Sequence, residues 1–255
     1  MGTTEGPGAT LARPWAAAWL LLAAIAAQAG APPSGPFTHS QCLECHTQTT
    51  PSLVQQWRDG PHGSTDCSAC HGPDHGALPK SRHDQTCVAC HGGLIAHSYQ
   101  GSKHGAIASI ERPRIDLGLP LQRGNYRVPG CAYCHLHAGD HGDGMAASRG
   151  PSSREWICSG CHAPRFVADQ LAAGRGLMEI GDLKRQEALA IAARHPGGPQ
   201  AVQALLEPLQ RHLANLRLGW GHQSPDYQWW HGQPALDGDL IRLRDAVEMA
   251  RRRAE

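Results

Sequence analysis

The apolar positions of this chain divide it into three regions. An unbroken apolar run extends from Trp15 to Ala27, close to the amino terminus. Residues 30 to 163 leave room only for loops and short helices, because motifs of cysteine and histidine recur along them. From residue 164 onward, apolar residues recur in steps of three and four, which predicts amphipathic helices. We therefore expect three segments, at 1–29, 30–163 and 164–255.

The last segment is predicted to contain about three helices. Residues 164 to 195 are rich in Ala, Leu, Glu and Arg, although Gly174 and Gly176 indicate an interruption or a helix end. Pro208 is expected to kink the second helix. The apolar positions with helical spacing are Val202, Leu205, Leu206, Leu209, Leu213 and Leu216, followed by Leu236, Leu240, Leu243, Val247 and Ala250. Packing of these helices on one another is favoured, and a cap on the preceding domain or a subunit interface is the alternative.

The amino-terminal segment has the features of a cleaved signal peptide. Arg13 precedes the apolar run, and Ala27-Gln28-Ala29 follows the A-x-A pattern of a signal-peptidase site. An uncleaved anchor is the alternative, but the run is short for a bilayer, which needs roughly 20 apolar residues. We expect residues 1–29 to be removed and the mature protein to be soluble and exported to the periplasm.

The composition excludes an ordinary aromatic core and a nucleic-acid partner. The chain has only two Phe and 5% aromatic residues overall, so another group must fill its interior. A formal net charge of +1 gives no electrostatic reason to bind a polyanion.

Five copies of CxxCH use all ten cysteines. In chain order these first to fifth motifs begin at Cys42, Cys67, Cys87, Cys131 and Cys158, and their second cysteines are Cys45, Cys70, Cys90, Cys134 and Cys161. Disulfides would explain an even number of cysteines in an exported chain, but they give no reason for a histidine after each second cysteine. Structural zinc sites would not need that histidine either, and five CxxC pairs would leave one pair over.

Covalently attached haem c accounts for every element of this spacing. Two thiols three positions apart reach the two vinyl groups of one porphyrin, and the next residue supplies an imidazole to the iron. The predicted proximal ligands are His46, His71, His91, His135 and His162. Five haems would replace the missing aromatic core. The predicted fold is mainly α, a multihaem cytochrome c with a haem-filled, loop-rich core and a C-terminal bundle of about three helices.

Histidine is the favoured ligand at the sixth coordination position. Seventeen histidines less the five in motifs leave twelve, whereas the segment after residue 29 has only Met145, Met178 and Met249. Four of these twelve, His62, His75, His104 and His141, precede a glycine, which would let the backbone pass close to a porphyrin face. The pattern is not specific, because His231 and the motif residues His71 and His91 also precede a glycine. The loop at 219–232 carries His222 and His231, either of which could ligate an iron. A tryptophan-rich packing loop is the alternative there.

Four segments resemble the multihaem hydroxylamine oxidoreductases. CLECHTQTTPSLVQQWRDGPHG is similar to the first haem motif of that family, CVACHGGLIAHSYQGSKHGAIA to its sixth, CAYCHLHAGDHGD to its seventh and CSGCHAPRFVADQL to its eighth. The helices after Cys161 resemble the long carboxy-terminal helices of the family. This resemblance implies that the distal ligands are His62, His75, His104, His141 and His222.

The chain also departs from that family in ways that bear on function. The family carries eight haems and this chain has five motifs, with only 15 residues between His71 and Cys87, where further motifs would lie. The missing part includes the haem at which hydroxylamine is oxidised. The resemblance therefore implies the electron-conducting haems without the reaction centre.

Two functions remain open from the sequence. The first is a periplasmic electron carrier with closely spaced bis-His haems and redox partner proteins, either donor and acceptor cytochromes or a quinone-linked complex. The second is an oxidoreductase acting on hydroxylamine, nitrite or tetrathionate at one five-coordinate haem, with proton donors among His97, His137, Lys103, Tyr133 and Arg123. An oligomer through the C-terminal helices, or membrane association through a partner, is compatible with either.

Overall fold

The computed structural model describes residues 33–114, 116, 128–136, 139–142 and 151–255. The predicted signal peptide therefore lies outside the described residues, as do Arg123, His137 and Met145. The chain divides into two compact units, Met1–Gly35 and Pro36–Glu255, and the following description concerns the second. Within the described ranges every regular element is a helix, so the fold is mainly α, as predicted.

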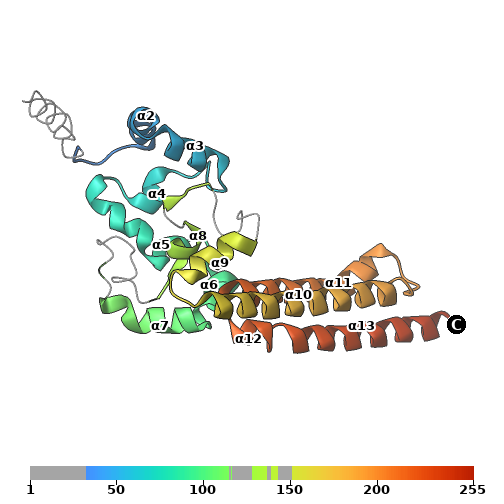
Figure 1. Cartoon of the computed structure of the whole chain (residues 1–255). Helices are drawn as coiled ribbons and strands as arrows, with labels where there is room; N and C mark the ends of the chain where they lie inside the picture. Colours follow the sequence, from blue (N-terminus) through green and yellow to red (C-terminus); the bar gives the residue numbers. More distant parts are fainter. Residues whose placement is uncertain (1–32, 115, 117–127, 137–138, 143–150) are drawn as a thin grey trace, which may run out of the picture. The chain divides into compact units, whose positions relative to one another are not determined.

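Short helices carry the five motifs (Figure 1). None of the elements before residue 160 exceeds 11 residues, as expected for a segment crowded with motifs. In chain order these elements are α2 (His39–Thr49), α3 (Pro51–Asp59), α4 (Cys67–His71), η1 (His75–Arg82), α5 (Asp84–Val88), α6 (Gly93–Gln100), α7 (Lys103–Glu111), η2 (Arg112–Arg114), α8 (Cys131–His135) and α9 (Pro151–Ser159).

Three long helices follow, in agreement with the predicted bundle. They are α10 (Pro164–Ala192), α11 (Pro199–His222) and α13 (Gln233–Ala254), with the short α12 (Pro225–Gln228) between the last two. Each long helix contacts the other two (Figure 1). Each has proline in its first turn, where the missing N–H costs no helical hydrogen bond. α11 continues to His222 with Pro208 inside it.

The apolar core of the described residues belongs to these long helices. Its buried members are Ala188, Ile191, Ala192, Leu206, Leu209, Leu213, Leu216, Leu236, Leu240, Leu243 and Val247. By contrast, the described residues between 36 and 163 include few buried apolar ones, and these are scattered: Val54, Ala108, Val128, Ala132 and Ile157. The described part of the motif segment therefore has no side-chain core of its own, as its composition indicates.

The predicted interruption at Gly174 and Gly176 is wrong, because α10 runs unbroken from Pro164 to Ala192. Gly174 is buried against Trp220 of α11, and a Cβ atom at this position would overlap the indole ring. The glycine therefore allows two helices to approach closely instead of ending one of them. Gly176 has open space around its Cα, so its cost is only the weaker helix propensity of glycine, about 1 kcal/mol.

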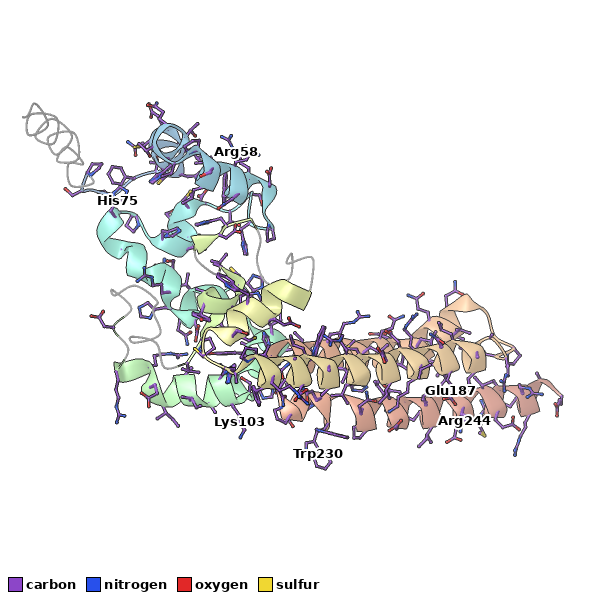
Figure 2. All side chains as sticks on the ribbon, viewed as in Figure 1. Arg58, His75, Lys103, Glu187, Trp230 and Arg244 are labelled. Carbon is purple, nitrogen blue, oxygen red and sulfur yellow. The ribbon has the colours of Figure 1, made fainter. Side chains whose placement is uncertain are left out.

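Polar contacts also tie the long helices together. The carboxylate of Asp239 is 2% exposed and accepts hydrogen bonds from Arg242 Nη2 (2.6 Å) and His212 Nδ1 (2.6 Å). Arg244 Nη2 donates to Glu187 Oε1 (2.6 Å), which links α13 to α10 (Figure 2). Among the described residues, no helix is both long enough and apolar enough to span a bilayer.

Replacing Leu216 with alanine tests whether the long helices form a close-packed core. Leu216 is 0% exposed and belongs to the core cluster, so the truncation leaves a cavity and should lower the free energy of unfolding by about 2–5 kcal/mol. Urea unfolding followed by far-UV circular dichroism measures this loss. Ile241→Ala is the matched control, because Ile241 is 59% exposed on α13 and its truncation should cost well under 1 kcal/mol. Equal losses in the two variants would contradict the assignment of Leu216 to the core.

Candidate haem site

Each CxxCH motif folds locally as about one helical turn. In the third motif the N–H of His91 donates to the carbonyl of Cys87 (2.8 Å), and in the fifth the N–H of His162 donates to that of Cys158 (3.0 Å). A helical turn brings residues i, i+3 and i+4 to one side, so both cysteines and the histidine of a motif share a face. All ten cysteines are described and none of them forms a disulfide bond, which leaves their thiols available for thioether bonds.

The structure brings every motif histidine together with one histidine from outside the motifs. Each of the five pairs of ring centres is about 6 Å apart. The pairs are His46 with His75 (6.1 Å), His71 with His141 (5.8 Å), His91 with His62 (5.9 Å), His135 with His222 (6.4 Å) and His162 with His104 (6.0 Å). The five outer partners are the same five histidines that the family resemblance implies as distal ligands.

This spacing fits one metal ion between the two rings of each pair. A bond from a metal ion to an imidazole nitrogen is about 2 Å long, so two imidazoles on opposite sides of one ion have ring centres about 6 Å apart. The donor set of two neutral imidazoles and two thiols per pair is that of a bis-His haem c. The residues present therefore fit this cofactor.

Burial keeps several of these rings in the neutral form that can ligate a metal. Desolvation lowers the pKa of His71, His104 and His135, and in each case a neighbouring histidine lowers it further. Desolvation together with His135 lowers the pKa of His222 to about 4. At neutral pH these imidazoles consequently have a free lone pair.

Hydrogen bonds at Nδ1 set the tautomer of three of the paired rings. His222 Nδ1 lies 2.6 Å from Ser98 Oγ, and the single hydroxyl proton of Ser98 is donated to the carbonyl of Ile95 (2.9 Å). His222 Nδ1 must therefore carry the proton, which leaves Nε2 free for a metal ion. His46 is held in the same way by Thr50 (2.8 Å). The Nδ1–H of His141 donates to the carbonyl of Gly139 (2.8 Å).

The elements around the outer histidines explain how they reach the motifs. His75 begins η1, and Asp74 caps that helix by accepting from the N–H of Ala77 (2.9 Å). His104 lies in the first turn of α7, and His222 is the last residue of α11. Hydrogen bonds from Trp57 to the carbonyl of Thr65 (3.2 Å) and from the N–H of His141 to Gln56 (3.4 Å) hold the turns around His62 and His141 against α3.

Three of the glycines that follow outer histidines lie against neighbouring backbone. A Cβ atom at Gly63 would lie 2.5 Å from the carbonyl oxygen of Arg58, and one at Gly105 would overlap that of Tyr99. At Gly142 it would lie 3.2 Å from the carbonyl oxygen of Gln56. Close approach between backbone segments therefore favours glycine at these three positions.

Other described histidines have different partners. His39 Nδ1 accepts from the N–H of Cys67 (3.2 Å), and His195 Nδ1 accepts from that of Gly197 (2.9 Å). His97 Nδ1 lies 2.9 Å from the hydroxyl of Tyr227, and His231 Nε2 lies 3.4 Å from Asp226. His231, which the sequence left as an alternative to His222, is thus not paired with a motif histidine.

Cysteines of consecutive motifs are neighbours. Burial and the nearby thiol of Cys42 raise the pKa of Cys67, so a cysteine of the first motif lies close to a cysteine of the second. Burial and the nearby thiols of Cys87 and Cys90 raise the pKa of Cys70, so the second motif lies close to the third. The thiols of Cys87 and Cys131 interact directly, which joins the third to the fourth.

The fourth and fifth motifs are joined in the same way. Burial, followed by the thiol of Cys158, raises the pKa of Cys134 to about 12. Tyr133, which the sequence offered as a proton donor, lies at this junction, and burial and the thiol of Cys161 raise its pKa. The five motifs thus form one series in chain order.

Part of the chain matches known multihaem proteins. Residues 54–148 match the family described as "Seven times multi-haem cytochrome CxxCH". The chain is similar to multihaem c-type cytochromes over this region, and the match implies covalently attached haem c. Its resemblance to the hydroxylamine oxidoreductases recurs among its relatives.

Two relatives from Kuenenia stuttgartiensis illustrate the resemblance. A probable nitrite reductase-hydroxylamine oxidoreductase fusion protein is 28% identical to this chain over an alignment of 163 residues, and the match covers 48% of this chain. The match spans only about a fifth (19%) of that longer protein. A chain of the reducing HAO-like protein complex Kustc0457/Kustc0458 shares the fold, with a TM-score of 0.50 and 15% identity over 88% of this chain and 89% of the solved chain.

Proposed function

We propose that this cytochrome is a periplasmic electron carrier with five bis-His haems, one at each CxxCH motif. The observation that carries the proposal is the pairing of every motif histidine with a second imidazole about 6 Å away. Haem c supplies one-electron chemistry when it is bound. The proposed ligand pairs are His46/His75, His71/His141, His91/His62, His135/His222 and His162/His104.

The neighbouring cysteines of consecutive motifs support a relay function. These cysteines would hold the haems through thioether bonds, so cysteines of consecutive motifs that lie close together would bring neighbouring attachment sites close together. The two histidines of each pair, held by helices and hydrogen bonds, would move little between oxidation states of a bound haem, and small reorganisation favours electron transfer. We infer that electrons pass along the motifs in chain order.

The alternative function is reduction or oxidation of a small nitrogen or sulfur compound. The fusion protein from Kuenenia stuttgartiensis is named for nitrite reductase and hydroxylamine oxidoreductase, which supports hydroxylamine and nitrite among the candidate substrates, beside tetrathionate. Such a reaction needs one iron with an open coordination position. The five imidazole pairs argue against this, since none of the described motif histidines lacks a second ring.

Haem counting and carbon monoxide binding test the proposed function together. Intact mass and a pyridine haemochrome assay of the matured protein should give five haems per chain. The fully reduced protein should bind no carbon monoxide, because every iron already has two imidazole ligands. Fewer than five haems would refute the stoichiometry, and carbon monoxide binding at one haem would favour the oxidoreductase, to be followed by turnover assays with hydroxylamine, nitrite and tetrathionate.

The location and partners of the cytochrome are part of the same proposal. The apolar run and A-x-A site at residues 15–29 support export to the periplasm. The proposed partners are redox proteins, either a donor and an acceptor cytochrome or a quinone-linked complex, through which the cytochrome could associate with a membrane. The long carboxy-terminal helices would be the surface for any oligomer.

A further inference from the structure

A single carboxylate connects the third and fourth motifs. Asp84 Oδ1 accepts a hydrogen bond from the backbone N–H of Cys131 (2.9 Å), which lies 47 residues later in the chain. Its other oxygen, Oδ2, accepts from Arg112 Nη2 (3.3 Å). Asp84 itself lies three positions before Cys87, the first cysteine of the third motif. The side chain is only 11% exposed, so solvent screens its charge weakly.

The first and second motifs are connected by the same construction. His39 lies three positions before Cys42, and its Nδ1 accepts a hydrogen bond from the N–H of Cys67 (3.2 Å), the first cysteine of the second motif. In both cases, therefore, the acceptor precedes one motif by three residues and caps the first cysteine of the next. In both cases the two first cysteines are also neighbours, Cys42 with Cys67 and Cys87 with Cys131.

The two connections differ in charge. A ring nitrogen that accepts a hydrogen bond has no proton, so His39 makes its contact as a neutral group. Asp84 makes the equivalent contact as a carboxylate, next to the cysteines of both the third and the fourth motif. Arg112 offsets this charge only in part, because its side chain is 43% exposed and contacts the oxygen that does not face Cys131.

We propose that Asp84 is a positioning residue that joins the third and fourth haem motifs edge to edge, and that its charge lowers the reduction potentials of the two haems attached there. This inference rests on the proposed function. A nearby negative charge stabilises the oxidised iron, which has one more positive charge than the reduced iron. His39 joins the first and second motifs as a neutral group. The carboxylate beside it, Asp66 at 3.8 Å from His39 Nδ1, is 68% exposed, so solvent screens its charge more strongly than that of Asp84.

Removing the charge while keeping the hydrogen bond tests the inference. In Asp84→Asn the amide oxygen still accepts from Cys131, so the fold and the haem content should match the wild type. We expect two of the midpoint potentials in a spectroelectrochemical titration to rise by about 59 mV, which is a tenfold change in the ratio of reduced to oxidised haem. Asp66→Asn is the matched control, because Asp66 also lies beside a first cysteine, Cys67, but its side chain is 68% exposed. It should shift the potentials much less.

The reciprocal substitution separates charge from simple packing. His39→Asp places a carboxylate at the equivalent position before the first motif, so it should lower two potentials by a similar amount. A shift in Asp84→Asn no larger than that in Asp66→Asn, or a shift spread evenly over all haems, would overturn the inference. The potentials are measured on the matured protein without carbon monoxide, so this result is independent of whether one iron proves to be open.

Discussion

Replacing His222 with alanine is expected to open one iron per chain to carbon monoxide. His222 faces His135 of the fourth motif with ring centres 6.4 Å apart, and Ser98 holds its Nδ1 so that Nε2 is free to ligate. Alanine removes that imidazole and supplies no other donor. Carbon monoxide uptake by the reduced protein, measured from its difference spectrum, should rise from none to one equivalent per chain.

His231→Ala is the matched control for this experiment. His231 lies nine residues after His222, has a half-exposed side chain and is near Asp226 rather than a motif histidine. Its replacement should therefore leave carbon monoxide binding unchanged. Uptake in the His231 variant but not in the His222 variant would reverse the assignment of the distal ligand, and uptake in neither would show that another residue completes this site.

A chain produced without haem is expected to keep its long helices and to lose the folded structure of the motif segment. The apolar core cluster contains only residues from α10, α11 and α13, whereas the buried apolar residues before residue 164 are isolated from it. Small domains that lack a side-chain core depend on their cofactor to fold. Limited proteolysis of residues 36–255, expressed where haem is not attached, should therefore leave a resistant fragment that begins near Pro164.

Mass spectrometry identifies that fragment, and the matured protein is the control. With haem attached, protection should extend through the motif segment to about residue 36. If the chain without haem were protected over its full length, the motif segment would have an unrecognised core of its own. If it were digested completely, the long helices would depend on the haem segment for their stability.

The sequence predicted the local structure of the motifs. The CxxCH spacing defines one helical turn, and the contacts within a turn depend only on neighbouring residues, so haem c could be predicted as the cofactor before any fold was known. The three long helices were also predictable, because apolar positions such as Leu213, Leu216 and Leu240 repeat at helical spacing. The glycine at position 174 was misread, since a local rule cannot show that Trp220 packs against it.

The contacts between motifs could be decided only by the tertiary structure. The resemblance offered five outer histidines as a set, and the fold assigned each one to a particular motif histidine. The roles of Ser98, His39 and Asp84 had no signal in the sequence, because their partners lie 124, 28 and 47 residues away. Local spacing determined which cofactor the motifs are suited to attach, because one helical turn brings the two thiols and the histidine of a motif to the same side. Packing determined which groups face each attachment site, because hydrogen bonds and ring contacts depend on distance in space and not on separation along the chain.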